Sequence, residues 1–361
     1  MAHAHGRYTG TRVLFIKKLK NIYTMRRFYL SMAFMSLSAL GFAQNSPYIK
    51  AVDEYVPAPG QFVNELPKLS ENDTPETAAE ACTKELAGEK QKGVVTLGAY
   101  GGYITFHFDH PVINVEGAPD FVVYGNAFDG SSEPGIVMVM KDENGNGKPD
   151  DTWYELSGSA DVDSVGKVIY NYEITYTPNP MQPIPWTDNQ GHSGAVQRVG
   201  GDYGHFQEYY PLWINKPLTF KGTLLPKNSY FNSQGWWVQN ALRYGYVDNL
   251  PNDKTEGFNI ENAVDANRKP VKLDQIDFVR VYCAVNDQCP KPNWVGELST
   301  EVKGAEDLHP TADKIDAPLN SNEETTVMAI YTIEGKQIKE LQRGLNIVKL
   351  ANGKVRKVLV K

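Results

Sequence analysis

The sequence predicts an all-β protein: a jelly-roll-like β-sandwich with one short helix, followed by a small C-terminal four-stranded β module. From residue 94 onward, short runs of β-branched and aromatic residues alternate with Gly, Pro, Asn and Asp. This is the strand-and-turn pattern of an all-β domain. Because a sheet with one apolar face needs another layer to cover it, we expect two packed sheets.

The individual elements follow from the same pattern. The clearest strand segments of the main domain are 103–108, 121–124, 136–140, 169–176, 218–220 and 278–282. The segment 74–92 is the one with helical character. It opens with Thr74 and Pro75, carries acidic residues early and lysines late, and so suits helix capping and the helix dipole.

Two domains are predicted. The strand signals continue without a break over 48–308, which we assign to a single β-sandwich surface domain. A polar segment, 309–325, is the expected linker, and 326–361 forms the C-terminal module. Its predicted strands are 327–333, 337–341, 345–350 and 355–360, and the turn Asn352-Gly353 is a strong hairpin signal.

The N-terminus predicts export. After an upstream extension, 1–24, residues 25–43 have a basic start, an apolar run and small residues at the end, the order of a signal peptide. The run is too short for a membrane span of about 20 residues. Residues 1–43 contain seven Lys/Arg and no Asp/Glu, so their removal leaves 29 basic against 43 acidic residues. Such a charge argues against nucleic acid or an anionic membrane as partner.

A candidate calcium loop lies between two predicted strands. Oxygen side chains recur at spacings typical of an EF-hand-type loop, Gly147 provides the sharp turn, and Lys148 would contribute its carbonyl. Because Trp153 stands where the closing Glu is usual, Asp151 or Glu155 would supply the last ligand. The alternative is a solvated hairpin loop without an ion. The predicted ligands of this structural Ca²⁺ are Asp142, Asn144, Asn146, Lys148, Asp150 and Asp151.

Aromatic residues beside polar groups predict ligand contacts. Flat apolar rings next to amides and carboxylates suit sugars and other amphipathic rings. Trp186 stands beside Asp188 and Asn189 in a Gly-containing segment, and the pair Trp236-Trp237 follows Asn232 to Gly235. Since neighbours on a strand alternate faces, the alternative for each Trp is burial in the core.

Three cysteines remain in the exported chain. Cys283 and Cys289 flank a short polar loop and are close enough in sequence to form a local disulfide, which would leave Cys82 unpaired. The alternative is that all three are free thiols.

Two resemblances extend these predictions. The C-terminal segment IYTIEGKQIKELQRGLNIVKLANGKVRKVLVK resembles the sorting domain of the type IX secretion pathway of Bacteroidetes, which implies transport across the outer membrane. The segments TLGAYGGYITFHFDHPV, PDFVVYGNAF, EPGIVMV and GELSTEVKGAEDL resemble a family of Bacteroidetes cell-surface proteins described as PKD-like. Some are encoded beside outer-membrane uptake systems for corrinoids or glycans. The resemblance implies a surface location and carries no functional residues over.

Taken with the absence of familiar catalytic motifs from the sequence, these features favour a binding protein over an enzyme. We expect a surface protein, at the cell exterior or secreted, that captures a small molecule or glycan for an outer-membrane transporter complex. A structural or adhesive module without such a ligand is the alternative. A glycoside hydrolase is a third reading, which needs two carboxylates facing each other across a cleft.

Overall fold

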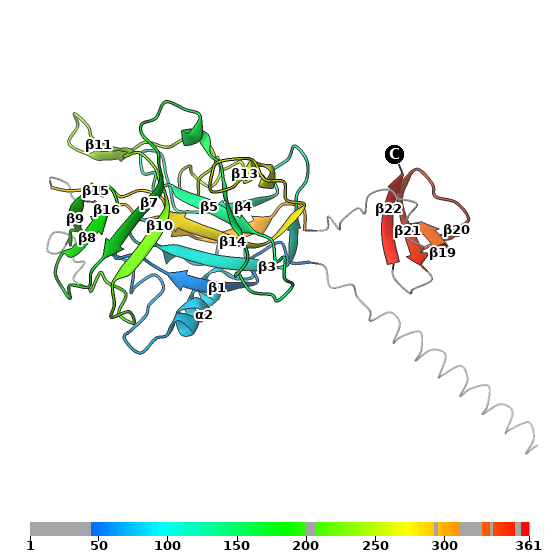
Figure 1. Cartoon of the computed structure of the whole chain (residues 1–361), viewed down its shortest axis with the longest axis horizontal. Helices are drawn as coiled ribbons and strands as arrows, with labels where there is room; N and C mark the ends of the chain where they lie inside the picture. Colours follow the sequence, from blue (N-terminus) through cyan, green and yellow to red (C-terminus); the bar gives the residue numbers. More distant parts are fainter. Residues whose placement is uncertain are drawn as a thin grey trace, which may run out of the picture. The chain divides into compact units, whose positions relative to one another are not determined.

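The computed structural model of the chain describes residues 45–199, 207–291, 295–310, 327–332, 335–350 and 355–360. The predicted signal peptide and upstream extension lie outside the described residues, as does the linker from residue 311 on. Within the described part, the chain is built almost wholly of β-strands arranged in several sheets (Figure 1). The all-β, sandwich-like prediction is confirmed.

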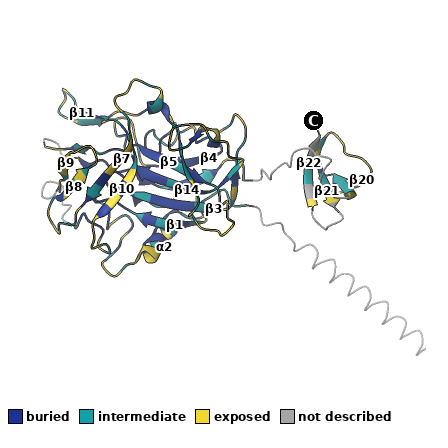
Figure 2. Ribbon diagram, in the orientation of Figure 1, coloured by how far each residue is buried: buried dark blue, intermediate teal, exposed yellow. Residues whose placement is uncertain are grey.

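A six-stranded antiparallel sheet forms the centre of the main domain. Strand β14 runs through its middle and pairs with β3 on one side and β5 on the other. Figure 2 shows these central strands as the most deeply buried part of the domain. The sheet contains, in order, β1 (Ala51–Val56), β3 (Tyr103–Ile113), β14 (Gln275–Cys283), β5 (Gly135–Met140), β6 (Trp153–Leu156) and β13 (Ala263–Val264).

A second, four-stranded sheet packs beside the end of β14. Its core is rich in tyrosine, and the Tyr100 ring meets Tyr282 of β14 edge to face, with 6.4 Å between ring centroids. The backbone amide of Thr223 donates to the Tyr282 hydroxyl at 2.9 Å, so the two sheets are joined by packing and by hydrogen bonds. The strands, in order, are β10 (Leu218–Leu224), β7 (Ile169–Tyr176), β8 (Ile184–Asp188) and β9 (Ser193–Val196).

Four short strand pairs complete the main domain and bring together segments that are distant in the sequence. Two of them join the last part of the domain to its first part. Two short 3₁₀ helices, Ser159–Asp161 and Ile260–Asn262, lie in the connections. The pairs are β2 (Val95–Thr96) with β17 (Glu301–Val302), β4 (Phe121–Tyr124) with β18 (Gly304–Asp307), β11 (Ser229–Phe231) with β12 (Trp237–Gln239), and β15 (Gln288–Cys289) with β16 (Gly296–Glu297).

The predicted helix is present as α2 (Pro75–Leu86), which packs against β1. Thr74 is its N-cap: the side chain accepts from the backbone of Thr77, whose hydroxyl accepts from the Thr74 amide. The helix ends earlier than predicted, because Ala87 is extended and Gly88 adopts a φ of 84°. Among the described residues, no helix combines the length and the apolar character needed to cross a membrane.

The C-terminal module has the four strands that the sequence predicts, arranged as one antiparallel sheet. Val348 and Val358 are buried in its small core, against which Ile330 packs. Asn346 is buried as well, and its side-chain amide donates to the carbonyls of Gln342 and Gly344. The order is β20 (Gln337–Ile338), β19 (Val327–Thr332), β21 (Gly344–Leu350) and β22 (Val355–Val360).

Candidate functional site

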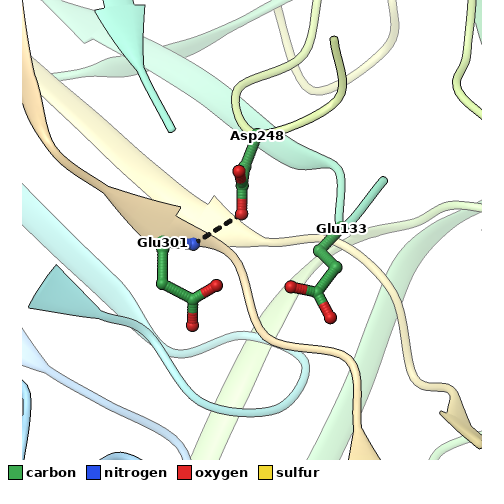
Figure 3. Close-up of side chains that lie close together, drawn as sticks. All are labelled: Glu133, Asp248 and Glu301. Carbon is green, nitrogen blue, oxygen red and sulfur yellow. Dashed lines mark hydrogen bonds between the residues drawn. The ribbon is translucent and has the colours of Figure 1, made fainter. Parts of the chain in front are cut away.

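Three acidic side chains that are far apart in the sequence converge in the main domain. Carboxylate oxygens of Glu133, Asp248 and Glu301 all lie within 4.8 Å of one another. Asp248 and Glu301 are buried and Glu133 is half-buried. Figure 3 shows the carboxylates of Glu133 and Glu301 side by side, with Asp248 reaching the same place from a third segment. We call these three residues the carboxylate cluster.

Backbone pairing at the start of β5 fixes the positions of Glu133 and Asp248. Gly135 and Val247 exchange two backbone hydrogen bonds of 2.9 Å, and the Glu133 amide donates to the Asp248 carbonyl at 2.9 Å. Gly135 is needed here because a Cβ on it would stand 2.7 Å from Cγ2 of Thr300. The Thr300 hydroxyl in turn donates to the Glu133 carbonyl, which ties the segment before β17 to the same point.

Asp248 is held by backbone amides. Its Oδ1 accepts from the amides of Asn126 and Ala127 at 2.6 and 2.7 Å, and its Oδ2 accepts from the amide of Glu301 at 2.9 Å. The residue adopts a φ of 54°, a left-handed conformation that is uncommon for any residue except glycine. Gly125 makes room for it, since a Cβ there would lie 2.4 Å from Oδ1 of Asp248.

Glu301 is positioned by the β2–β17 pair, in which it stands opposite Thr96. The Thr96 hydroxyl donates to Oε1 of Glu301 at 2.9 Å and lies 2.6 Å from the Ser299 hydroxyl. Ser299 also accepts from the amide of Gly98 at 3.0 Å. The buried carboxylate therefore sits at the end of a short chain of hydroxyl groups.

Burial makes the cluster retain protons. Loss of hydration, with the neighbouring negative charges second, raises the pKa of Glu133 and of Asp248 well above the usual range of a carboxyl group. Burial also raises the pKa of Glu301, to about 7, although the hydroxyls of Ser299 and Thr96 stabilise its charged form.

The cluster forms part of the wall of a pocket of about 540 Å³. Glu133 and Glu301 line it, whereas Asp248 is not among its lining residues. Its rim is aromatic: Trp236 and Phe128 are 61% and 66% exposed. We call it the acidic-aromatic pocket; its aromatic and acidic lining residues are Phe62, Phe128, Glu133, Trp236, Trp237, Glu297 and Glu301.

The hairpin of β11 and β12 carries the two tryptophans. Asn232 closes its turn by accepting from the amides of Gln234 and Trp236 with its side-chain oxygen. Trp236 is exposed, while Trp237 is partly buried against the main core and donates from its ring nitrogen to the Pro290 carbonyl at 2.8 Å. Trp236 precedes strand β12 and Trp237 begins it, and both residues line the pocket.

A fourth acidic residue, Glu297, lines the same pocket. Its Oε1 accepts from the Gln61 amide at 2.6 Å, but its buried Oε2 has no hydrogen-bond partner. Glu297 is 1% exposed, and burial raises its pKa to about 8. A buried oxygen without a partner is costly in free energy.

The predicted calcium loop joins β5 to β6, which pair as an antiparallel hairpin. Asp142 organises it: Oδ1 accepts from the amides of Gly145 and Asn146, and Oδ2 from the amide of Gly147 at 2.8 Å. Gly147 has the expected left-handed conformation, with a φ of 69°. The Lys148 amide donates to the side chain of Asn146. The loop thus folds around its acidic side chains.

Of the remaining predicted ligands, Asp150 and Asp151 make contacts within the loop, whereas Glu155 does not. Asp150 accepts from the side-chain amides of Asn144 and Asn146, and Asp151 accepts from the backbone amide of Glu143. These groups are in the loop, and an all-oxygen set suits Ca²⁺. Glu155 is engaged elsewhere, by Arg268 at 2.6 Å and by the Tyr282 hydroxyl at 2.7 Å. The ion itself stays a prediction.

The second predicted tryptophan group lies away from this pocket. Trp186 is on strand β8 and packs with the tyrosine-rich core of the second sheet. Asp188 shapes the turn to β9, accepting from the amides of Gln190 and His192. The side-chain amide of Asn189 donates to the Asn171 carbonyl. The structure therefore brings only Trp236 and Trp237 to the carboxylates.

The cysteines follow the second alternative, three free thiols. Cys82, Cys283 and Cys289 are all free and buried. The Cys283 thiol lies 3.6 Å from the Leu298 carbonyl, and the Cys289 sulfur accepts from the Gln239 side chain at 3.3 Å. The disulfide considered for Cys283 and Cys289 is not formed, because each sulfur is directed to a different local partner.

Sequence reasoning did not find the carboxylate cluster. Glu133 and Asp248 stand in loop segments and Glu301 on strand β17. More than a hundred residues separate the first two and more than fifty the last two, so no local spacing marks the cluster. The one available signal was the polar run before β5, in which Glu133 stands directly ahead of Pro134. Neither a family model nor a curated protein matches the chain.

Proposed function

We propose that this chain is an exported surface protein that captures a small molecule or glycan in the acidic-aromatic pocket and delivers it to an outer-membrane uptake system. One observation carries the proposal. The aromatic pair predicted from sequence to contact a ligand, Trp236 and Trp237, lines the same concavity as three buried or half-buried carboxyl groups, those of Glu133, Glu297 and Glu301.

The chemistry of this wall suits a polyhydroxylated ligand. The exposed faces of Trp236 and Phe128 offer flat apolar surface against which the C–H face of a sugar ring packs. Carboxyl groups that retain protons can donate as well as accept hydrogen bonds, so they match hydroxyl groups in either direction. The unpaired Oε2 of Glu297 supplies one acceptor for such a hydroxyl.

The N-terminal order of basic, apolar and small residues supports export, and the resemblance to surface proteins near uptake systems supports the destination.

A purely structural or adhesive module is the alternative. The arrangement of exposed aromatics distinguishes the two classes, because capture needs them around a concavity. Trp236 and Phe128 stand together at the pocket rim, which favours capture.

A glycoside hydrolase is the second candidate, favoured by Glu297. A carboxyl group with a pKa of about 8 is protonated at neutral pH, as a general acid must be. However, hydrolysis requires two carboxyl groups about 5–9.5 Å apart with the scissile bond between them. Carboxylate oxygens of Glu133 and Glu301 instead lie within 4.8 Å of each other, closer than this range. Binding is therefore our proposal.

Thermal melting against panels of glycans and corrinoids tests the proposal, because a ligand that binds only the folded state raises its stability. We expect one class to raise the melting temperature of the wild type and to lose that effect in Trp236→Ala. Tyr244→Ala, which removes another exposed aromatic that lines a different pocket, is the matched control and should respond like the wild type.

A ligand that stabilises Trp236→Ala as much as the wild type would contradict the assignment to this pocket. Stabilisation by neither panel would favour the adhesive module. Chemical analysis of the bound glycan after incubation separates capture from hydrolysis: capture leaves it intact, and cleavage products would establish the hydrolase.

A further inference from the structure

We propose that Glu133, Asp248 and Glu301 bind one Ca²⁺ at the base of the acidic-aromatic pocket. This site is separate from the loop of Asp142 to Asp151. It goes beyond capture of a small molecule and does not depend on it, because the ion needs the carboxylates and not the tryptophans.

The spacing of the three carboxylates fits one central ion. Their oxygens lie within 4.8 Å of one another. An ion that holds oxygen at about 2.3–2.6 Å spans opposed ligands up to about 5 Å apart, so one Ca²⁺ can lie within reach of an oxygen from each of the three groups. Mg²⁺ holds its ligands at about 2.0–2.1 Å in a strict octahedron and retains several waters, which suits this spread less well.

The donor atoms also select a hard cation. All three side chains offer oxygen, and the hydroxyl groups of Thr96 and Ser299 beside Glu301 offer oxygen as well. Histidine or thiolate ligands would favour zinc or copper. Within the described residues, this is the one group of three acidic, His or Cys side chains close enough to share an ion.

Glu297 is an independent sign that the wall meets something beyond protein. Its carboxyl is 1% exposed and its Oε2 has no partner, although Oε1 is fixed by the Gln61 amide at 2.6 Å. Glu297 and Glu301 line the same pocket. A coordinated ion with its shell of waters or ligand hydroxyls would supply the missing donor, since metal-bound hydroxyl groups are strong hydrogen-bond donors.

The position of the cluster leaves one side of the ion open. Asp248 does not line the pocket and is anchored by three backbone amides, whereas Glu133 and Glu301 line the pocket. Three carboxylates fall short of the six to eight oxygens that Ca²⁺ takes unless they bind in bidentate fashion. The remaining positions therefore face the pocket, where hydroxyl groups of a polyhydroxylated ligand can enter.

Calorimetric titration of the purified protein with Ca²⁺ tests the site. Because the loop of Asp142 to Asp151 is predicted to bind Ca²⁺ as well, the titration is done in a variant whose loop site is removed. In Asp142→Ala, which removes the main ligand of the loop, we expect one ion per chain to remain. In Asp142→Ala combined with Glu301→Gln, we expect that ion to be lost. Trp236→Ala and Glu65→Gln, an exposed carboxylate outside the pocket, should leave the stoichiometry unchanged.

Because Glu301 is buried, its variant is checked for folding by circular dichroism, and the half-buried Glu133→Gln serves as a second variant with the same expected loss. In the Asp142→Ala background, full retention of the ion by folded Glu133→Gln or Glu301→Gln would overturn the proposal. So would an Asp142→Ala protein that binds no Ca²⁺. Loss of ligand capture in Trp236→Ala with Ca²⁺ binding intact would show that ion and ligand use separable parts of the pocket.

Discussion

The Oδ2 oxygen of Asp248 accepts a hydrogen bond of 2.9 Å from the backbone amide of Glu301 (Figure 3). Through this bond a loop carboxylate reaches the backbone of β17, and the side chain of Glu301 is directed to the same place as that of Glu133. Three negative groups are thus held together by neutral backbone donors. Their mutual repulsion is offset by retained protons or, in our account, by a cation.

Gly125→Ala tests how tightly this arrangement is built. A Cβ at residue 125 would stand 2.4 Å from Oδ1 of Asp248 and 2.6 Å from its Cα, so the Asp248 loop must shift. We expect a loss of stability of about 1–3 kcal/mol, typical of overpacking, together with weaker Ca²⁺ binding. Chemical unfolding and calorimetry measure the two effects, and a variant as stable as the wild type would show that the loop tolerates displacement.

The pH dependence of stability should report Glu297. Its pKa is about 8 in the folded protein against 4.5 for the ordinary group, so folding favours the protonated form. The stabilisation is complete below pH 4.5 and is lost as the pH rises to about 8, at about 1.4 kcal/mol per pKa unit. Glu301 acts in the same direction up to about pH 7. The charge of Glu297 also acts on Tyr209 and Tyr176. Burial raises the pKa of Tyr209 to about 12 and that of Tyr176 well above its ordinary value, so neither tyrosine titrates between pH 5 and pH 8.

In chelator, therefore, the melting temperature of the wild type should fall between pH 5 and pH 8. Glu297→Gln keeps the acceptor for the Gln61 amide but cannot ionise, so its decline should be smaller. Glu65→Gln, at the surface, is the control and should follow the wild type. Parallel curves for Glu297→Gln and the wild type would mean that Glu297 does not titrate in this range.

The loop of Asp142 to Asp151 gives a separate calcium prediction. Asp142, Asp150 and Asp151 place three negative charges in one loop, so Ca²⁺ should stabilise the hairpin of β5 and β6, with an affinity of about 10⁻⁴–10⁻³ M. The gain in melting temperature on adding Ca²⁺ should be smaller in Asp142→Ala than in the wild type. Asp129→Ala, at an exposed aspartate outside the loop, should gain as much as the wild type. An undiminished gain in Asp142→Ala would leave the solvated-turn alternative.

Export predicts the mass of the mature protein. If residues 25–43 act as a signal peptide, the protein recovered from the producing cell should lack residues 1–43, because cleavage follows the small residues at the end of the apolar run. Intact-mass spectrometry reads this directly. A recovered chain that still contains Met25 to Ala43 would contradict export by this route.

Much of the fold could be predicted because strand signals are local. The strands 121–124 and 169–176 were predicted with the bounds that they have as β4 and β7. Strand β3 was predicted to stop at residue 108, before Asp109-His110-Pro111, yet it continues to Ile113. Its register with β14 is irregular between Ile276 and Phe278, opposite this segment. A bulge accommodates Pro111, which cannot donate to a ladder.

The site was predictable only in part, for the same physical reason. Trp236 and Trp237 stand in a polar turn that is visible in the sequence, and they reach the pocket. Glu133, Asp248 and Glu301 carry no local signal, because the Gly135–Val247 pairing and the β2–β17 pair assemble them from distant segments. Trp186 had the same local signal as Trp236 but belongs to a strand that packs on the second core, a difference that only tertiary structure decides.

The most direct test of the account is a crystal structure of the mature protein grown with Ca²⁺ and a ligand selected by thermal melting. We predict density for the ligand between Trp236 and Glu301, and an ion coordinated by Glu133, Asp248 and Glu301. Ligand density at another place on the surface, with an ion-free carboxylate cluster in the presence of saturating Ca²⁺, would contradict the assignment of this pocket as the site of capture.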